Sequence, residues 1–130
     1  ALQWRFSDHP RGVFARFSPD GTRVALAFRD GKVGLLDGEN GALLSLRDGH
    51  LNQAYWPAFT SDGTRFATTS RDHTVRLWST ETGERVLTQM INPITWSFRS
   101  LFGPEDRWLA VTTTGNRIRL YHATDLPARD

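Results

Sequence analysis

The sequence predicts an all-β protein built from three four-stranded antiparallel sheets. The segment Asp20-Gly21-Thr22-Arg23 recurs 42 residues later as Asp62-Gly63-Thr64-Arg65. Around both copies, short strand-like runs alternate with turn residues, and no apolar pattern of period 3.6 is long enough for a helix. A repeat of this length is typical of modules that cannot bury their own faces and therefore stack on one another.

The repeat unit occurs three times along the chain. The first copy runs from Phe17 to Leu36, the second from Phe59 to Trp78, and a third, shifted by 43 residues, from Phe102 to Tyr121. Tight turns are expected at the Asp-Gly pairs, because both residue types tolerate positive φ. The strands are expected at 12–17, 23–28, 32–37 and 42–46, at 54–59, 65–70, 74–79 and 84–89, and at 95–102, 107–113 and 117–122.

The third copy lacks a fourth strand, and the first residues of the chain contain a candidate for it. Residues 1–9 align with residues 42–50 at a shift of 41. We therefore expect Leu2–Phe6 to be the last strand of a sheet that is split between the two ends of the chain. A strand of this kind removes two exposed sheet edges at once.

These residues resemble the WD-repeat (Trp-Asp repeat) β-propeller family over essentially the whole chain. The second copy is nearly complete, and the outer two are degraded. The first copy has Phe28 at the expected hydroxyl position and Leu36 in place of Trp, while the third keeps Thr113 but has Gly115 and Tyr121 in place of Asp and Trp. The second copy matches the family pattern at Gly49-His50, Phe59, Asp62-Gly63, Ser70, Asp72 and Val75-Arg76-Leu77-Trp78, with Ser79 at the name-giving Asp.

The resemblance implies three four-stranded propeller blades that form a partial propeller. Residues 1–6 are expected to be the outer strand of a split blade, 9–46 blade 1, 50–89 blade 2, and 92–122 the first three strands of blade 3. Propellers typically have four to eight blades. Closure is therefore expected either by oligomerisation of two or three chains, with Leu2–Phe6 of one chain completing the last blade of the next, or as part of a larger ring.

The resemblance also implies a structural hydrogen-bond network in the second copy. In it, His50 links Asp72 to Ser70, and Ser70 reaches the indole N–H of Trp78, with Thr69 as the alternative hydroxyl. The residues His50, Ser70 and Asp72 also supply the chemical groups of a nucleophilic triad. The structural interpretation is favoured over the catalytic one.

Family members mostly act as rigid interaction platforms, so the resemblance implies a non-catalytic protein-interaction scaffold rather than an enzyme. Arginine and aromatic residues dominate binding hot spots, and Arg29 and Arg71 favour an acidic or phosphorylated peptide as partner. In an alternative interpretation, Trp96 and Phe98 are strand residues that are buried between blades and do not bind a partner. The residues expected on the narrow partner-binding face are Arg11, Val13, Arg29, Gln53, Tyr55, Arg71, Trp96, Phe98 and Thr114.

The composition of the chain argues against several other classes of function. The chain has 16 basic and 14 acidic residues, which interleave along every segment, so nucleic-acid binding is disfavoured. There is no cysteine and no histidine pair at metal-ligand spacing, so no metal and no cofactor are expected. No membrane span or secretory signal is visible, which favours a cytoplasmic location. The alternative function is a small-ligand or catalytic site in the central channel, where Arg16 and Arg99 could hold an anion.

Overall fold

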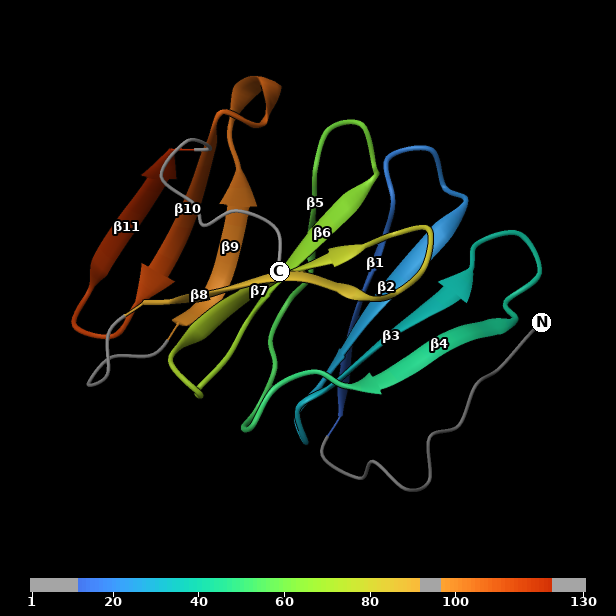
Figure 1. Cartoon of the computed structure of the whole chain (residues 1–130), viewed down its shortest axis with the longest axis horizontal. Helices are drawn as coiled ribbons and strands as arrows, with labels where there is room; N and C mark the ends of the chain where they lie inside the picture. Colours follow the sequence, from blue (N-terminus) through green and yellow to red (C-terminus); the bar gives the residue numbers. More distant parts are fainter. Residues whose placement is uncertain (1–11, 92–96, 123–130) are drawn as a thin grey trace.

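The computed structural model describes residues 12–91 and 97–122, which form eleven strands in three antiparallel sheets (Figure 1). The predicted all-β class is confirmed, and the sheets do not close into a ring. The expected strand Leu2–Phe6 lies outside the described residues. The strands are β1 (Val13–Phe17), β2 (Arg23–Phe28), β3 (Lys32–Asp37) and β4 (Leu43–Asp48) in the first sheet; β5 (Ala58–Phe59), β6 (Arg65–Thr69), β7 (Thr74–Ser79) and β8 (Arg85–Met90) in the second; and β9 (Ser97–Phe102), β10 (Trp108–Thr113) and β11 (Arg117–His122) in the third.

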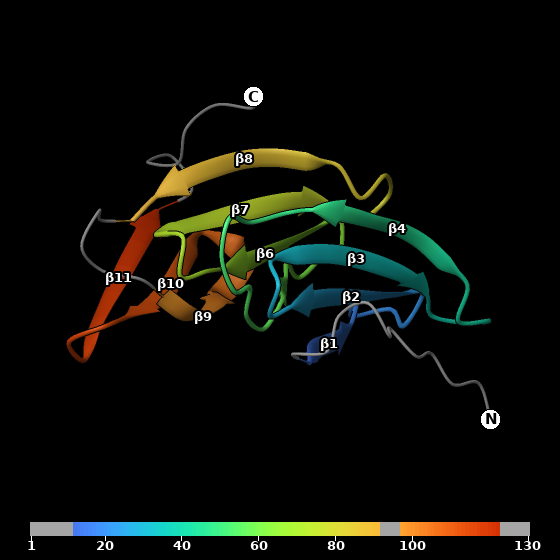
Figure 2. The same ribbon diagram turned by 90° about the horizontal axis from the view of Figure 1, so that it is seen from below.

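The three sheets stand side by side like the blades of a fan, in the order of the chain (Figure 1). Within each sheet, neighbouring strands follow one another in sequence. Figure 2 shows β1 and β9 along one edge of the assembly and β4 and β8 along the opposite edge. The one helical segment among the described residues is the 3-10 turn η1 (Pro104–Asp106), so that part of the chain has no helix long and apolar enough to cross a membrane.

The first strand of the second sheet is much shorter than the expected 54–59. Regular pairing is restricted to Ala58 and Phe59, with one further isolated bridge between Ala54 and Ser70. Pro57 lies between these two pairing sites and has no N–H to donate to a neighbouring strand. The backbone therefore leaves the sheet at Trp56 and Pro57.

The two Asp-Gly turns are tight, but only the glycines adopt positive φ, with values of 76° at Gly21 and 71° at Gly63. The aspartates that precede these glycines do not adopt positive φ. Instead, the Asp20 carboxylate accepts hydrogen bonds from the N–H and the hydroxyl of Thr22, at 3.0 and 2.8 Å. Aspartate favours turns here because its side chain satisfies backbone donors.

Two apolar clusters hold the three sheets together. Between the first and second sheets, Ala25, Val33 and Leu35 pack against Phe66 and Trp78. Between the second and third, the buried side chains are those of Ala67, Val75, Leu77, Leu87, Ile91, Leu109 and Val111. Successive side chains of a strand point to opposite faces of the sheet. The second sheet therefore packs one face against the first sheet, through Phe66 and Trp78, and the opposite face against the third, through Ala67 and Leu77.

The turns after the first strands add a second, repeated contact between sheets. Pro19 of the first turn approaches Gly63 of the second, where an added Cβ would lie 3.4 Å from the Pro19 Cδ. The next pair of turns makes the corresponding contact through polar groups. The N–H of Ser61 donates to both carboxylate oxygens of Asp106, at 2.9 and 3.0 Å, and its hydroxyl donates to Oδ2 at 2.7 Å. The same turn therefore joins each sheet to the next.

Gly31 lies where the β2 to β3 turn meets the segment that connects the first two sheets. Its φ is +99°, and an added Cβ would lie 2.4 Å from the backbone oxygen of His50 and 2.9 Å from that of Asn52. Gly21 also has positive φ, but an added Cβ there meets nothing within 4 Å. An alanine at Gly21 would therefore meet backbone strain alone, whereas an alanine at Gly31 would meet both backbone strain and a steric clash.

We expect Gly31→Ala to lower the free energy of unfolding more than Gly21→Ala does. The left-handed conformation alone costs a side chain about 1 kcal/mol, and Gly31→Ala must also displace two backbone carbonyls, for a total of roughly 2 kcal/mol or more. Urea unfolding of both variants measures the difference. Equal losses would show that the connection between the sheets adapts to the methyl group.

Candidate functional site

The second sheet contains a buried hydrogen-bonded chain of four side chains, the His50 network, made of His50, Thr68, Asp72 and Trp78. The Trp78 indole N–H lies 2.8 Å from the Thr68 hydroxyl, which lies 2.7 Å from His50 Nε2. The other ring nitrogen, Nδ1, lies 2.9 Å from Asp72 Oδ2. Since the indole can only donate, the consistent assignment has Thr68 donating to Nε2 and His50 donating from Nδ1 to the carboxylate.

Asp72 ends this network and accepts several further hydrogen bonds. Its Oδ1 receives the N–H and the hydroxyl of Thr74, at 3.0 and 2.6 Å, and its Oδ2 receives the N–H of Leu51 at 3.1 Å. Only 4% of the Asp72 side chain is exposed, and none of the His50 side chain. A substrate cannot reach a group buried in this way, so the geometry supports the structural interpretation of these residues over a catalytic triad.

The hydroxyl in the network is that of Thr68, which corrects the expected Ser70 and the alternative Thr69. Phe66 pairs directly with Trp78 and Thr68 with Arg76, so Thr68 is the diagonal neighbour of the indole. Ser70 lies one further step along the same face, out of reach of Trp78, and Thr69 points to the opposite face. By the same register, the equivalent position is Leu26 in the first copy and Val111 in the third, rather than Phe28 and Thr113.

Ser70 forms hydrogen bonds with backbone groups at the turn between β6 and β7. Its hydroxyl accepts the N–H of Asp72 at 3.0 Å and donates to the carbonyl of Asn52 at 3.2 Å. It therefore holds the backbone of the turn next to the connection between the first two sheets. The sequence shows both hydroxyls, but only the pairing register tells which of them meets the indole.

The environment of the network keeps His50 neutral and Asp72 ionised. Burial lowers the pKa of His50, and this effect outweighs the opposing influence of Asp72. Burial raises the pKa of Asp72, but the hydrogen bonds from His50, Thr74 and the Leu51 N–H outweigh it and hold that pKa well below its ordinary range. The network is therefore stable in one protonation state, with a single negative charge on Asp72.

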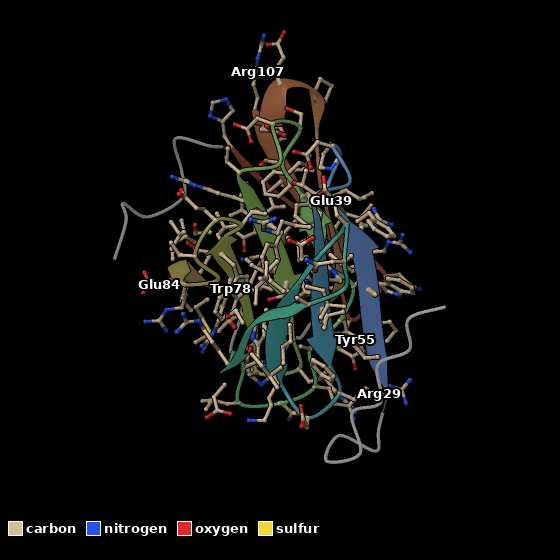
Figure 3. The ribbon with its side chains drawn as sticks, turned by 90° about the vertical axis from the view of Figure 1, so that its right-hand side faces the viewer. Arg29, Glu39, Tyr55, Trp78, Glu84 and Arg107 are labelled. Atoms are coloured by element: carbon tan, nitrogen blue, oxygen red, sulfur yellow. The ribbon has the colours of Figure 1, made fainter. Side chains whose placement is uncertain are left out.

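The proposed narrow face lies at the end of the sheets that carries the β2 to β3 and β6 to β7 turns. Arg29 and Arg71 occupy equivalent positions in these turns, and both are exposed. The Arg71 N–H donates to the Gln53 carbonyl at 3.1 Å, and the Tyr55 hydroxyl donates to the Gln53 side chain at 3.1 Å. Figure 3 shows Arg29 and Tyr55 toward one end of the molecule and Arg107 at the other.

The structure thus groups four of the expected partner-binding residues at one end of two adjacent sheets. Gln53, Tyr55 and Arg71 are joined by hydrogen bonds, and Arg29 occupies the equivalent turn of the neighbouring sheet. We call Arg29, Gln53, Tyr55 and Arg71 the narrow-face strip. Arg11, Trp96 and the side chain of Phe98 lie outside the described residues.

A row of side chains along the inner strands was not anticipated from the sequence. Phe14 and Trp56 have ring centroids 4.8 Å apart, and the Arg99 guanidinium carbon lies 5.8 Å from the Trp56 ring centroid. The spacings of 42 and 43 residues place these three side chains at equivalent positions of the repeat. The sequence did not predict this row, because the three equivalent positions hold different residue types. The guanidinium of Arg99, which was a candidate for holding an anion in the channel, lies over the Trp56 ring.

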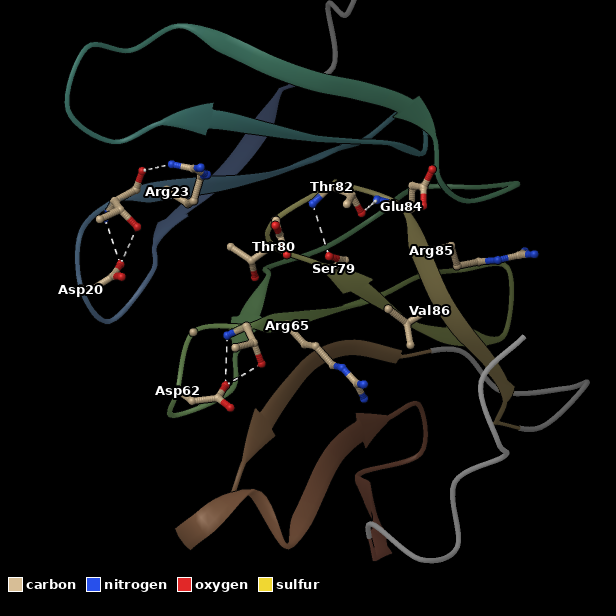
Figure 4. Close-up of a pocket in the computed structure, with 14 residues that line it drawn as sticks. Asp20, Arg23, Asp62, Arg65, Ser79, Thr80, Thr82, Glu84, Arg85 and Val86 are labelled. Carbon is tan, nitrogen blue, oxygen red and sulfur yellow. Dashed lines mark hydrogen bonds between the residues drawn. The ribbon is translucent and has the colours of Figure 1, made fainter.

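The end opposite to the narrow face contains a groove of about 760 Å³ between the first two sheets (Figure 4). Hydroxyl groups and charges of both signs line it, including Thr22, Arg23, Arg65 and Thr80. The Asp20 side chain already serves its own turn, and the Thr22 N–H and the Ser18 and Thr22 hydroxyls lower its pKa to about 2. In Figure 4 the arginines extend away from one another, so no charged groups converge on a ligand position.

The antiparallel sheets stand side by side as the blades of a β-propeller do, and the second sheet carries the buried network of Trp78, Thr68, His50 and Asp72. Residues 41–79 match the WD40 family, described as WD domain, G-beta repeat. This segment contains the complete network residues of the second copy. The expected resemblance to the WD-repeat β-propeller family is thereby confirmed.

Solved structures agree with this fold. The β-propeller domain of Cps50 (Swd1) from Myceliophteria thermophila superposes with a TM-score of 0.78 at 18% identity, over 92% of this chain and 36% of that one. The chain therefore spans about a third of the length of the matched structure. No curated protein matches the sequence.

We expect Thr68→Val to destabilise the protein by about 2–4 kcal/mol, because it leaves the indole N–H and an imidazole nitrogen buried without partners. Thr69→Val is the matched control. Both threonines are fully buried, but the Thr69 hydroxyl has no hydrogen-bond partner among the described residues, so its loss is expected to change stability by less than about 0.5 kcal/mol. Thermal and urea unfolding measure both. Similar losses in the two variants would contradict the assigned network.

Stability is expected to fall as the pH drops below about 6.5. Below this pH, His50 becomes protonated in the unfolded chain but stays neutral in the folded state, because the folded-state pKa of His50 is lowered. One such proton contributes up to about 2 kcal/mol between pH 6.5 and pH 5. The lowered pKa of Asp72 adds a second loss that begins below about pH 4.

The first loss can be assigned to His50 by measuring urea unfolding at about pH 7.5 and pH 5. We expect His50→Gln to be less stable than the wild type at both pH values but to lose less stability between them. Parallel pH dependences of the two proteins would show that His50 is not the group responsible.

Proposed function

We propose that this protein is a non-catalytic interaction scaffold that binds a partner peptide or protein on its narrow face. WD40 propellers generally act as protein-interaction scaffolds. The observation that carries the proposal is the narrow-face strip, in which each of two adjacent blades presents an exposed arginine at the same turn position. His50 and Asp72 of the second blade are held in the buried His50 network.

The chemistry of the strip favours an acidic or phosphorylated peptide. A guanidinium group offers paired N–H donors that match carboxylate and phosphate oxygens, and such charge-assisted bonds are stronger than neutral ones. Tyr55 adds an aromatic surface beside Arg71, and its hydroxyl is oriented by Gln53. The backbone of Arg71 is fixed by Gln53 and that of Arg29 by the Gly12 carbonyl, so both turns are preorganised.

We also propose that further blades complete the open ring. The sheets do not close, and the described third sheet has three strands rather than four. The additional blades come either from one or two further copies of this chain or from the remainder of a larger propeller. The first possibility gives a closed cyclic assembly.

The strip is tested by charge reversal in the variant Arg29→Glu/Arg71→Glu. Fluorescence anisotropy would compare peptides rich in glutamate or phosphoserine with neutral peptides of the same length. We expect the wild type to prefer the charged peptides and the variant to bind them at least about tenfold more weakly, which corresponds to about 1.4 kcal/mol.

The matched control is Arg47→Glu/Arg107→Glu, which changes the net charge by the same amount away from the strip. It is expected to retain the binding of the wild type apart from a small effect of overall charge. Binding that does not distinguish charged from neutral peptides, or that survives reversal of the strip, would refute the proposal. Thermal unfolding of each variant confirms that it is folded.

A further inference from the structure

The segment that joins the first two sheets, residues 49–55, is fixed on both of its sides by hydrogen bonds. On the side of the first sheet, the His50 N–H donates to the Gly31 carbonyl at 2.8 Å. Four residues later, the Ala54 N–H donates to the Phe28 carbonyl at 3.0 Å. The two bonds hold the segment against the β2 to β3 turn at both ends of that turn.

The other side of the same segment is held by the β6 to β7 turn. The Leu51 N–H donates to Asp72 Oδ2 at 3.1 Å, and the Arg71 N–H donates to the Gln53 carbonyl at 3.1 Å. In Figure 1 the tip of the segment lies between the two turns. The chain between the first two sheets therefore crosses the narrow face between Arg29 and Arg71.

Leu51 lies on this segment with its side chain in the solvent. The side chain is 90% exposed, more than any other large apolar side chain of the described residues. Single apolar residues are common on protein surfaces. Leu51 differs because its own N–H is bound to Asp72 and the preceding side chain, that of His50, is fully buried, so the backbone holds it in water. A side chain on an ordered backbone loses little entropy when a partner binds it.

We propose that the partner peptide carries an apolar side chain between two anionic side chains, and that Leu51 contacts the apolar one. The inference rests on the peptide binding proposed above and deepens it by naming the order of groups in the partner. Arg29 and Arg71 occupy equivalent turns and provide two positions for anionic groups, with Leu51 between them. Contact between two apolar side chains removes both from water, whereas a polar side chain at the central position gives no such gain.

Fluorescence anisotropy with three peptides of equal length and charge tests this order. The first peptide has a leucine between two glutamate-rich segments, the second has a serine at that position, and the third has the leucine at one end. A matching set with phosphoserine in place of glutamate identifies the preferred anion. We expect the wild type to bind the first peptide about tenfold more tightly than the other two, as for a partly buried leucine contact.

Two substitutions at Leu51 separate its apolar character from its mere presence. Leu51→Ser is expected to bind the three peptides equally, whereas Leu51→Met, which stays apolar, is expected to keep the preference for the first. Leu44→Ser is the matched control, because it makes the same change at a leucine of β4 that is 48% exposed and lies away from the narrow-face strip. It is expected to bind like the wild type.

The outcomes distinguish this inference from the binding surface on which it rests. A wild type that binds the three peptides equally, or a preference that survives in Leu51→Ser, would overturn the role of Leu51. The surface itself would stand in both cases if the Arg29→Glu/Arg71→Glu variant still loses affinity for the charged peptides. A wild type that binds no charged peptide would refute the surface and the order of groups together.

Discussion

The burial of one sheet face against the next sheet is the interaction on which the rest of this structure depends. A four-stranded sheet has two faces and cannot bury either of them alone. The clusters around Val33 and Val75 solve this by giving each sheet the same small set of apolar residues at the same positions. Stacking then fixes the turns of successive sheets side by side, and the narrow-face strip exists because two equivalent turns are held next to each other.

The His50 network connects this packing to the proposed binding surface. Asp72 lies directly after Arg71, and its carboxylate fixes the N–H of Leu51 and the turn residue Thr74. The N–H of His50 donates to the Gly31 carbonyl of the first sheet, so the same residue also joins two sheets. A buried network of this kind tolerates no missing member, because each unpaired group costs the full desolvation penalty. One blade therefore holds the geometry of the turns on which the exposed arginines lie.

The degraded third copy has its own contacts in place of that network. Asp106 stands where the other copies have glycine, adopts a φ of 55°, and accepts both donors of Ser61. Arg119 donates to the Ile91 carbonyl at 2.6 Å, as Arg76 does to the Gly49 carbonyl at 2.7 Å. The departures from the repeat at the turn after β9 thus form a specific contact with the second sheet, and the arginine contact is retained while the Trp and Asp positions are not.

The sequence by itself determined the class of fold, the three copies and nearly every strand, because local turn chemistry and period-two patterns repeat at a fixed spacing. It also identified His50, Asp72 and Trp78. The tertiary structure decided that Thr68 rather than Ser70 meets the indole, since only the register of β6 against β7 places one hydroxyl diagonally opposite Trp78. It alone revealed the row of Phe14, Trp56 and Arg99, whose chemistry does not repeat. It alone placed Leu51 between the two arginine turns, because hydrogen bonds between segments far apart in the sequence hold the connecting segment there.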